Sequence, residues 1–196
     1  MKSRTGLYVI LGIIVILFFW GCGAYNGLIG VDQDVKTKWG NVETNYQRRT
    51  DLYNSVIKTI EGSANFEKGT LTEVVQARAK ATSINVDIND PKSLEAYQNA
   101  QAGLQSSFSK LLAVVENYPD LKTTAAFQGF QTQIEGTENR INVARQDFNA
   151  AVQSYNLRVK TFPNNIFASI FGYHEKPFYK ADPGSEKAPD VKFDIK

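Results

Sequence analysis

Residues 28–60 read LIGVDQDVKTKWGNVETNYQRRTDLYNSVIKTI, and their pattern is the clearest indication of the fold. Their large apolar and aromatic side chains recur at steps of three and four residues, which is the spacing of one face of an α-helix. They are Leu28, Val31, Val35, Trp39, Val42, Tyr46, Tyr53, Val56 and Ile60. Arg49 takes the heptad position between Tyr46 and Tyr53. No proline precedes Pro91, so we predict one long helix that ends near Gly62 and packs against other helices.

The segment before this helix is a run of 19 uncharged residues, 6–24, reading GLYVILGIIVILFFWGCGA. At about 1.5 Å per residue it covers roughly 28 Å, close to the hydrocarbon thickness of a bilayer. The run predicts a transmembrane helix that includes Leu11, Ile14, Leu17, Phe18 and Trp20. The span either continues directly into the next helix or bends at Gly27 and Gly30.

The charges that flank the span predict its orientation. Lys2, Arg4 and the terminal amine precede it, whereas acidic and basic residues balance over 32–38. The positive-inside rule then puts the N-terminus in the cytoplasm. We therefore expect a single-pass protein of the cell inner membrane, with most of the chain on the periplasmic or extracellular side.

Two other interpretations of the N-terminus compete with a permanent span. A cleaved signal peptide needs small residues before the cut, but Phe18, Phe19 and Trp20 are bulky and no A-x-A pattern follows. A lipoprotein anchored through Cys22 fits the small Gly21 before the cysteine, although Phe-Trp departs from the usual pattern further back. The lipoprotein is kept as the alternative.

Composition excludes several classes of function. The chain has 22 basic and 20 acidic residues, and Lys2 and Arg4 are the charged residues of the first 24, so residues 25–196 carry no net charge. A neutral domain lacks the electrostatic footprint of nucleic-acid binding. One cysteine and one histidine, His174, cannot build a His-rich metal site or a Cys–His pair inside the core. We expect no catalytic residues, metal or cofactor.

Three further helices are predicted after the first. They cover about 70–83, from Pro91 to just before Tyr118-Pro119, and about 121–161, and their apolar residues again alternate three- and four-residue steps. The fold class is all-α, a transmembrane helix followed by an antiparallel bundle of about four long helices. The predicted organisation is an anchor over 1–24, a bundle over 25–172 and an extended or disordered tail over 173–196.

The end of the bundle is rich in aromatic residues. A short apolar turn is expected over 166–171, and the aromatic side chains here are Phe167, Phe171, Tyr173, Phe178 and Tyr179. They either cap the bundle or contact the membrane or a partner.

Buried arginine is the most informative signal in the bundle. Arg49 and Arg78 both fall on apolar stripes, and a buried cation is costly unless it is paired. Candidate partners are Glu43, Asp51, Glu116 and Glu138. Three interpretations stay open: an ion-pair network that fixes helix register, arginine heads that reach the surface, or a site for an anionic ligand. We expect Arg49 to pair with a carboxylate of the third or fourth helix.

Several motifs, in order along about residues 25–180, make the chain resemble the LemA family of bacterial membrane proteins. They are Tyr25-Asn26, Trp39 with Val42-Glu43, Gln47-Arg48-Arg49-x-Asp51-Leu52, Ala77-Arg78-Ala79, Glu116-Asn117-Tyr118-Pro119-Asp120-Leu121-Lys122, Thr137-Glu138-Asn139-Arg140-Ile141, Ala144-Arg145, Tyr155-Asn156 and Thr161-Phe162-Pro163. The family pattern after Asp-Leu usually reads Ile-Pro-Asn-Leu-Val, whereas here it is Tyr53-Asn54-Ser55-Val56-Ile57. The resemblance implies a single-pass membrane protein with a long antiparallel helical domain and no assigned reaction.

The sequence supports two alternative functions. The first is a non-enzymatic scaffold or interaction protein of the bacterial envelope, which contacts the lipid bilayer and binds itself, another envelope protein or both. The alternative is a module that binds a small ligand or peptide through buried arginines between helices.

Overall fold

The computed structural model describes residues 2–62, 68–122 and 124–181. The elements in these ranges are helices, and no strand occurs among them. Their bounds are α1 Lys2–Glu61, α2 Lys68–Ser83, α3 Pro91–Val115, α4 Pro119–Lys122, α5 Ala125–Lys160 and α6 Asn164–Ile170. The all-α fold predicted from the sequence is confirmed.

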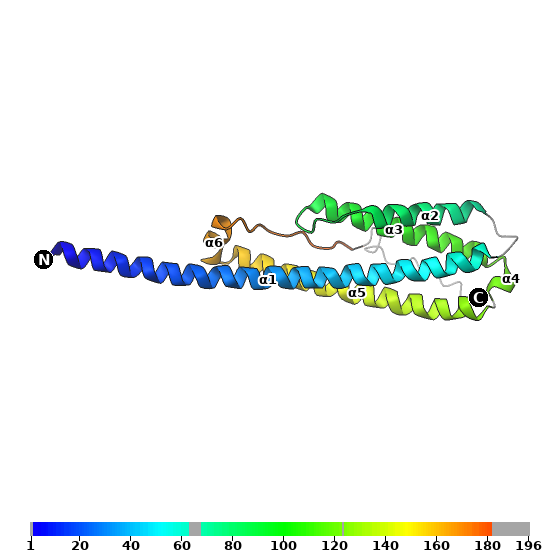
Figure 1. Cartoon of the computed structure of the whole chain (residues 1–196), viewed down its shortest axis with the longest axis horizontal. Coiled ribbons are helices and arrows are strands. Elements are labelled where there is room, and N and C mark those ends of the chain that lie inside the picture. Colours follow the sequence, from blue (N-terminus) through cyan, green and yellow to red (C-terminus); the bar gives the residue numbers. More distant parts are fainter. Residues whose placement is uncertain (1, 63–67, 123, 182–196) are drawn as a thin grey trace, which may run out of the picture.

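Helix α1 joins the apolar run to the bundle without a break. Its 60 residues would measure about 90 Å, and it continues through Gly27 and Gly30. Figure 1 shows its N-terminal part projecting beyond the other helices. Large apolar side chains there, from Leu7 to Trp20, are 45–70% exposed. By length and composition this part of α1 is able to cross a membrane.

The bundle consists of two helix pairs connected by aromatic side chains. Helix α1 packs closely along α5, and α2 along α3, while the two pairs approach each other less closely. Rings fill the space between them. Tyr53 of α1 stacks on Phe108 of α3 with ring centres 3.7 Å apart. Trp39 meets Tyr97 and Phe148 edge-to-face at 5.5 and 5.3 Å. Such pairs add stability beyond the area they bury.

The region predicted as one helix over 121–161 is divided into α4 and α5. Thr124 has extended backbone angles (φ −64°, ψ 139°), which a continuous helix cannot accommodate, and its side chain accepts a hydrogen bond from the backbone N–H of Phe127 at 3.3 Å. It is therefore the N-cap of α5. Further on, the expected short apolar turn is the helix α6, which follows a cis Phe162–Pro163 peptide bond.

Residues 173–181, here called the strap, run without regular secondary structure from α6 back along the bundle. Lys176 and Tyr179 are buried at 6% and 4% exposure, so the strap is part of the packed structure. The remainder of the expected tail, 182–196, lies outside the described residues. The strap packs against the helices that precede it, so its packing does not separate the bundle from the tail at residue 172. The domain boundary predicted there stays a prediction.

Candidate functional site

Arg49 lies at the centre of the bundle and is fully buried (0% exposed). Its Nη2 donates to the side-chain Oε1 of Gln101 at 2.7 Å and to the backbone carbonyl of Gln101 at 3.2 Å. Its Nη1 lies 3.4 Å from Oε1 of Glu138. The guanidinium therefore links α1, α3 and α5, and Glu138 is the carboxylate of the long C-terminal helix that faces it.

Aromatic rings complete the surroundings of Arg49. The guanidinium carbon lies 4.6 Å from the ring centre of Tyr46 and 5.8 Å from that of Tyr53, within cation–π range. Burial raises the pKa of Tyr53 to about 12, against the opposing effect of Arg49. Burial, with Tyr46 and Glu43 nearby, raises the pKa of Tyr97 as well. These phenols stay neutral near pH 7 and serve as packing and hydrogen-bonding groups.

Arg49 belongs to a polar layer across the bundle, here called the Arg49 layer, made of Arg49, Thr50, Gln101, Thr137 and Glu138. Both threonines are buried and donate to their own helices, Thr50 to the Tyr46 carbonyl at 3.1 Å and Thr137 to the Gln133 carbonyl at 2.8 Å. The apolar core is divided here into one cluster that ends at Tyr46 on α1 and a second that begins at Tyr53. Sliding one helix by a turn would leave the guanidinium unpaired, so the layer favours one register.

The other predicted partners of the arginines lie elsewhere. Glu43, Asp51 and Glu116 are exposed, and Asp51 accepts a hydrogen bond from Gln47 at 3.0 Å. Arg78 is half-buried on α2. Of the six candidate site residues, the described structure brings Arg49 and Glu138 together as an ion pair.

Gln101 was missed as a site residue, and its sequence signal was available. It interrupts the apolar stripe of α3, which contains Leu94, Tyr97, Leu104 and Phe108, and it is 4% exposed. A polar residue on an apolar stripe needs a buried partner. Arg49 on the neighbouring stripe is that partner.

A second polar arrangement holds the strap against α5. Asn156 donates to the backbone carbonyl of Lys176 at 2.9 Å and accepts from the Lys176 N–H at 2.8 Å. Asn149 makes the same pair of bonds to Tyr179, at 2.9 and 2.8 Å. The two asparagines are seven residues apart, so they share one face of α5. These asparagine side chains thus satisfy backbone N–H and C=O groups of the strap, which in a β-strand would bind the backbone of a neighbouring strand.

The Lys176 side chain connects the strap to α1 and to the loop before α3. Its Nζ lies 3.0 Å from Oδ1 of Asp32, donates to the side-chain oxygen of Asn89, and lies 4.8 Å from the ring centre of Tyr155. Asp32 also pairs with Lys36 at 2.8 Å. Burial raises the pKa of Asp32, but the hydrogen bonds from Lys36 and Lys176 outweigh burial and hold it below the ordinary value of 3.8. Asp32 is therefore ionised near pH 7 and neutralises the buried ammonium.

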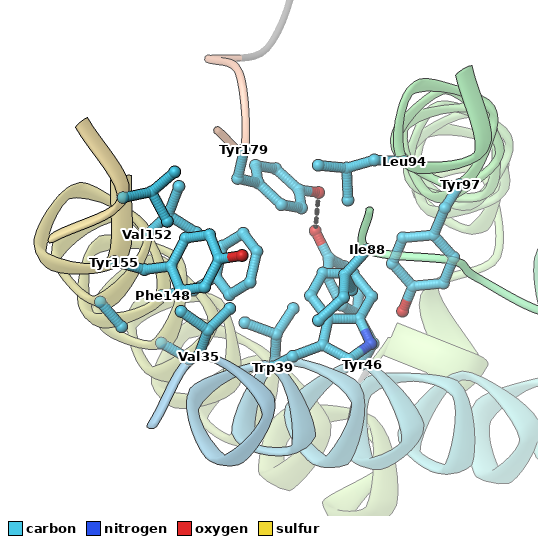
Figure 2. Close-up of a cluster of buried hydrophobic side chains, with 14 of the residues drawn as sticks. Val35, Trp39, Tyr46, Ile88, Leu94, Tyr97, Phe148, Val152, Tyr155 and Tyr179 are labelled. Atoms are coloured by element: carbon cyan, nitrogen blue, oxygen red, sulfur yellow. Dashed lines mark hydrogen bonds between the residues drawn. The ribbon is translucent and has the colours of Figure 1, made fainter. Parts of the chain in front are cut away.

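Tyr179 connects the strap to the buried cluster that contains Trp39, Tyr46, Phe148 and Tyr155 (Figure 2). Its hydroxyl lies 2.6 Å from that of Tyr46 in a hydrogen bond. Arg145 donates through Nε to the Tyr46 hydroxyl at 2.9 Å, and its guanidinium carbon lies 4.6 Å from the Tyr179 ring centre. Leu94 and Ile88 line the same cluster. Apolar packing and hydrogen bonds thus both hold the C-terminal part of the strap, at Tyr179, against the bundle.

Sequence reasoning identified Tyr179 as part of an aromatic end but missed the side chains that bind the strap. Asn149 and Asn156 stand in the interior of a long helix, where asparagine is a poor helix former. That mismatch was the available signal. The motifs that carried the family resemblance also contain Arg145 and Asn156, both of which contact the strap or its cluster.

The polar side chains of these two arrangements bind mainly other groups of the same chain. Within residues 2–62, 68–122 and 124–181, no group of three or more His, Cys, Asp and Glu side chains is placed to hold a metal. His174 is exposed, and its backbone carbonyl accepts the Tyr155 hydroxyl at 2.9 Å. The buried Nε of Arg49 has no hydrogen-bond partner in the described part of the chain, whereas the other hydrogen bonds and ion pairs described above hold helices and strap in place.

The fold and these contacts define a class: a helical protein in which one apolar, membrane-length helix continues into a bundle closed by a strap. The chain belongs to the LemA family, whose model matches residues 38–193. The resemblance inferred from the motifs is thereby confirmed.

Three relatives illustrate the similarity. The chain is 24% identical to Magnetosome protein MamQ 2 of Paramagnetospirillum magneticum, over 83% of this chain and 66% of that protein. It is 25% identical to Magnetosome protein MamQ of Magnetospirillum gryphiswaldense, over 78% and 65%. It is 26% identical to Protein LemA of Metamycoplasma hominis, over 86% and 74%. The match thus spans about two thirds of the MamQ proteins, and the three names state no reaction.

Proposed function

We propose that this protein is a non-enzymatic, membrane-anchored scaffold or interaction protein of the bacterial envelope. The observation that carries the proposal is the continuity of α1, which runs from the apolar segment through the whole bundle as one helix. A single-pass anchor with its N-terminus in the cytoplasm would then hold the bundle rigidly on the other side of the membrane. Rigid presentation of a helical surface is what a scaffold requires.

The proposed partners are the lipid bilayer and either a second copy of this chain, another envelope protein or both. The bundle carries balanced charge, which supports protein contacts rather than nucleic-acid binding.

The alternative, a ligand site built around Arg49, has weaker support. Both terminal nitrogens of Arg49 are already engaged by Gln101 and Glu138, and two tyrosine rings cover the guanidinium. A ligand would have to displace these groups. We therefore assign Arg49 a structural role.

Site-specific photocrosslinking of the full chain in intact bacterial membranes tests the proposed function. A photoreactive amino acid would replace an exposed residue, Gln105 of α3 or Glu135 of α5, and the matched control would replace the buried Phe108. We expect discrete adducts at exposed positions, with this chain or one dominant envelope protein as the other component, and none at position 108. A bundle surface that gives no adduct at any exposed position would contradict the scaffold.

A further inference from the structure

The residues around α6 form an uncharged stretch with exposed apolar side chains. Residues 161–173 read TFPNNIFASIFGY, with Lys160 before them and His174 and Glu175 after them. Four of the large side chains face outward: Phe162 is 75% exposed, Ile166 51%, Ile170 69% and Phe171 43%. Water-exposed apolar groups at this density are typical of a surface that contacts something else.

Helix α6 packs on α1 at the end of the apolar run. The Phe167 ring lies 5.7 Å from the Trp20 ring, and the Phe171 ring lies 4.8 Å from that of Tyr25. A Cβ at Gly21 would lie 3.0 Å from Phe167, so glycine allows the ring to approach closely. Figure 1 shows α6 at the end of the bundle nearest the N-terminal part of α1. The segment is thus placed beside residues that the proposed span contains.

An apolar groove of about 510 Å³ runs between the two helices. Its walls are Leu17, Phe18, Gly21, Cys22 and Tyr25 from α1, with Phe167 and Phe171 from the α6 side. Because one wall is the outer surface of the span, the groove faces the acyl chains that surround α1 in a bilayer. The position of the groove beside the span therefore indicates lipid acyl chains as its occupant.

Charged side chains from beyond both ends of the α6 segment contact α1 just past its apolar run, over residues 27–32. The Arg158 guanidinium lies over Gly27, so close that a Cβ there would collide with it. Lys176 pairs with Asp32, about 7.5 Å further along α1, and Lys160 pairs with Glu175 at 2.7 Å. Gly27 lies about 4.5 Å beyond Ala24, the last residue of the uncharged run. The apolar part of α1 and the segment around α6 are thus both followed by charged side chains, and those of Arg158 and Lys176 meet α1 over residues 27–32.

We propose that α6 is an interfacial membrane helix, which inserts Phe162, Ile166, Ile170 and Phe171 into the leaflet on the bundle side while the groove accommodates lipid acyl chains. This inference rests on the proposed insertion of α1. An interfacial helix lies about 5–10 Å into the boundary between headgroups and acyl chains, which matches the level of Trp20 and Tyr25. The stretch carries no charge, so insertion depends on apolar burial and is insensitive to anionic lipid.

The test is the membrane depth of single spin labels on the full chain. The protein, carrying Cys22→Ala, would be reconstituted at high lipid-to-protein ratio in phosphatidylcholine vesicles, with and without phosphatidylglycerol. Labels at Ile166→Cys and Ile170→Cys report on α6, Val143→Cys on an exposed apolar site of the bundle, and Ile14→Cys on the span. Power saturation with oxygen and a water-soluble nickel chelate measures the depth of each label.

We expect depths of about 5–10 Å at 166 and 170, a deeper label at 14, and a fully aqueous label at 143, in both lipid mixtures. Aqueous labels at 166 and 170, with the label at 14 in lipid, would overturn this inference and leave the anchor intact. Labels at 166 and 170 shielded from both reagents would also overturn it, by showing a protein contact. An aqueous label at 14 would overturn the anchor and this inference together.

A charged substitution supplies the second measurement. Ile170→Glu should move the label at Ile166→Cys from lipid into water, because a carboxylate opposes insertion of the same face. The matched change Val143→Glu should leave that label where it was. An unchanged depth in the Ile170→Glu variant would contradict the insertion of α6, provided that circular dichroism shows the helices intact.

Discussion

Arg49 and Lys176 both bury a positive charge, but their surroundings differ. Arg49 lies between helices, where amide and carbonyl groups of Gln101 make its short hydrogen bonds and the carboxylate of Glu138 is 3.4 Å away and 29% exposed. Lys176 comes from the strap and has a carboxylate, Asp32, at 3.0 Å. Arg49 is thus held mainly by the dipoles of the two Gln101 oxygens, and Lys176 mainly by the negative charge of Asp32.

The difference indicates separate roles for the two buried cations. A guanidinium paired loosely with its acid adds little net stability but penalises wrong helix registers strongly. A close ion pair, supplemented by backbone bonds from Asn156, fastens a segment that has no secondary structure of its own. The Arg49 layer thus specifies how the helices align, and the Lys176 site specifies where the chain continues after α6.

Removing the Arg49 side chain should have the largest effect. Arg49→Ala leaves a cavity and a stranded Gln101, so we expect the free energy of unfolding to fall by about 3 kcal/mol. Arg49→Met fills the space without charge and should stay within about 1 kcal/mol of the natural protein. Urea unfolding of the full chain in detergent micelles measures both. Equal losses for Ala and Met would mean that the charge itself stabilises the bundle.

Gln101→Leu should have the next largest effect. It removes the 2.7 Å bond to the Arg49 guanidinium and leaves a buried charge with fewer acceptors, which lowers the free energy of unfolding by about 2 kcal/mol. The matched control is Gln105→Leu, on the exposed face of the same helix. If the two variants unfolded alike, the guanidinium would not depend on Gln101.

A smaller and local effect is expected at the strap. Asn156→Ala removes both hydrogen bonds to the Lys176 backbone, so local opening of residues 173–181 should become easier by about 1–2 kcal/mol. Amide hydrogen exchange in the strap should accelerate by roughly tenfold, while amides in the C-terminal half of α3 keep their protection. Gln153→Ala, an exposed change on α5, should alter neither. Acceleration across the whole bundle would show that strap and helices open as one unit.

Acid should loosen the strap as the smallest effect of the series. The folded pKa of Asp32 lies below its ordinary value of 3.8, so its contribution to stability is complete above that pH and disappears as the pH falls through the folded value. After correction for the intrinsic pH dependence of exchange, strap opening should increase only below about pH 3.8. Asp32→Asn should remove this pH dependence. A transition near neutral pH would assign it to a different group.

The sequence predicted the helices well, because their signals are local and periodic. Pro91 marked the start of α3, where the structure shows Asp90 as the N-cap, and the stripe from Leu28 to Ile60 marked the face that α1 buries. Arg49 stood out as a polar residue on that stripe. The break at Thr124 was missed because the apolar pattern continues on both sides of it.

The strap could not be predicted in the same way. Residues 173–181 have neither helical periodicity nor a neighbouring strand, so their position depends on Asn149, Asn156 and Asp32, which are distant in sequence. Residues 173–196 as a whole contain glycine, prolines and charges of both signs, a composition that is typical of a free tail. Which acid would face Arg49 was open for a similar reason, since four carboxylates were candidates and three of them are exposed in the folded chain.

The rigid scaffold depends on the continuity of α1 from anchor to bundle, which can be measured as a distance across the junction. Spin labels at Val15→Cys and Asn41→Cys, in the Cys22→Ala full chain in vesicles, are separated by 26 residues of α1. Double electron–electron resonance should give one narrow distribution centred at about 39 Å, the length of that many residues in a straight helix. A broad distribution, or one centred well below that distance, would show a hinge near Gly27 and Gly30 and contradict the rigid scaffold.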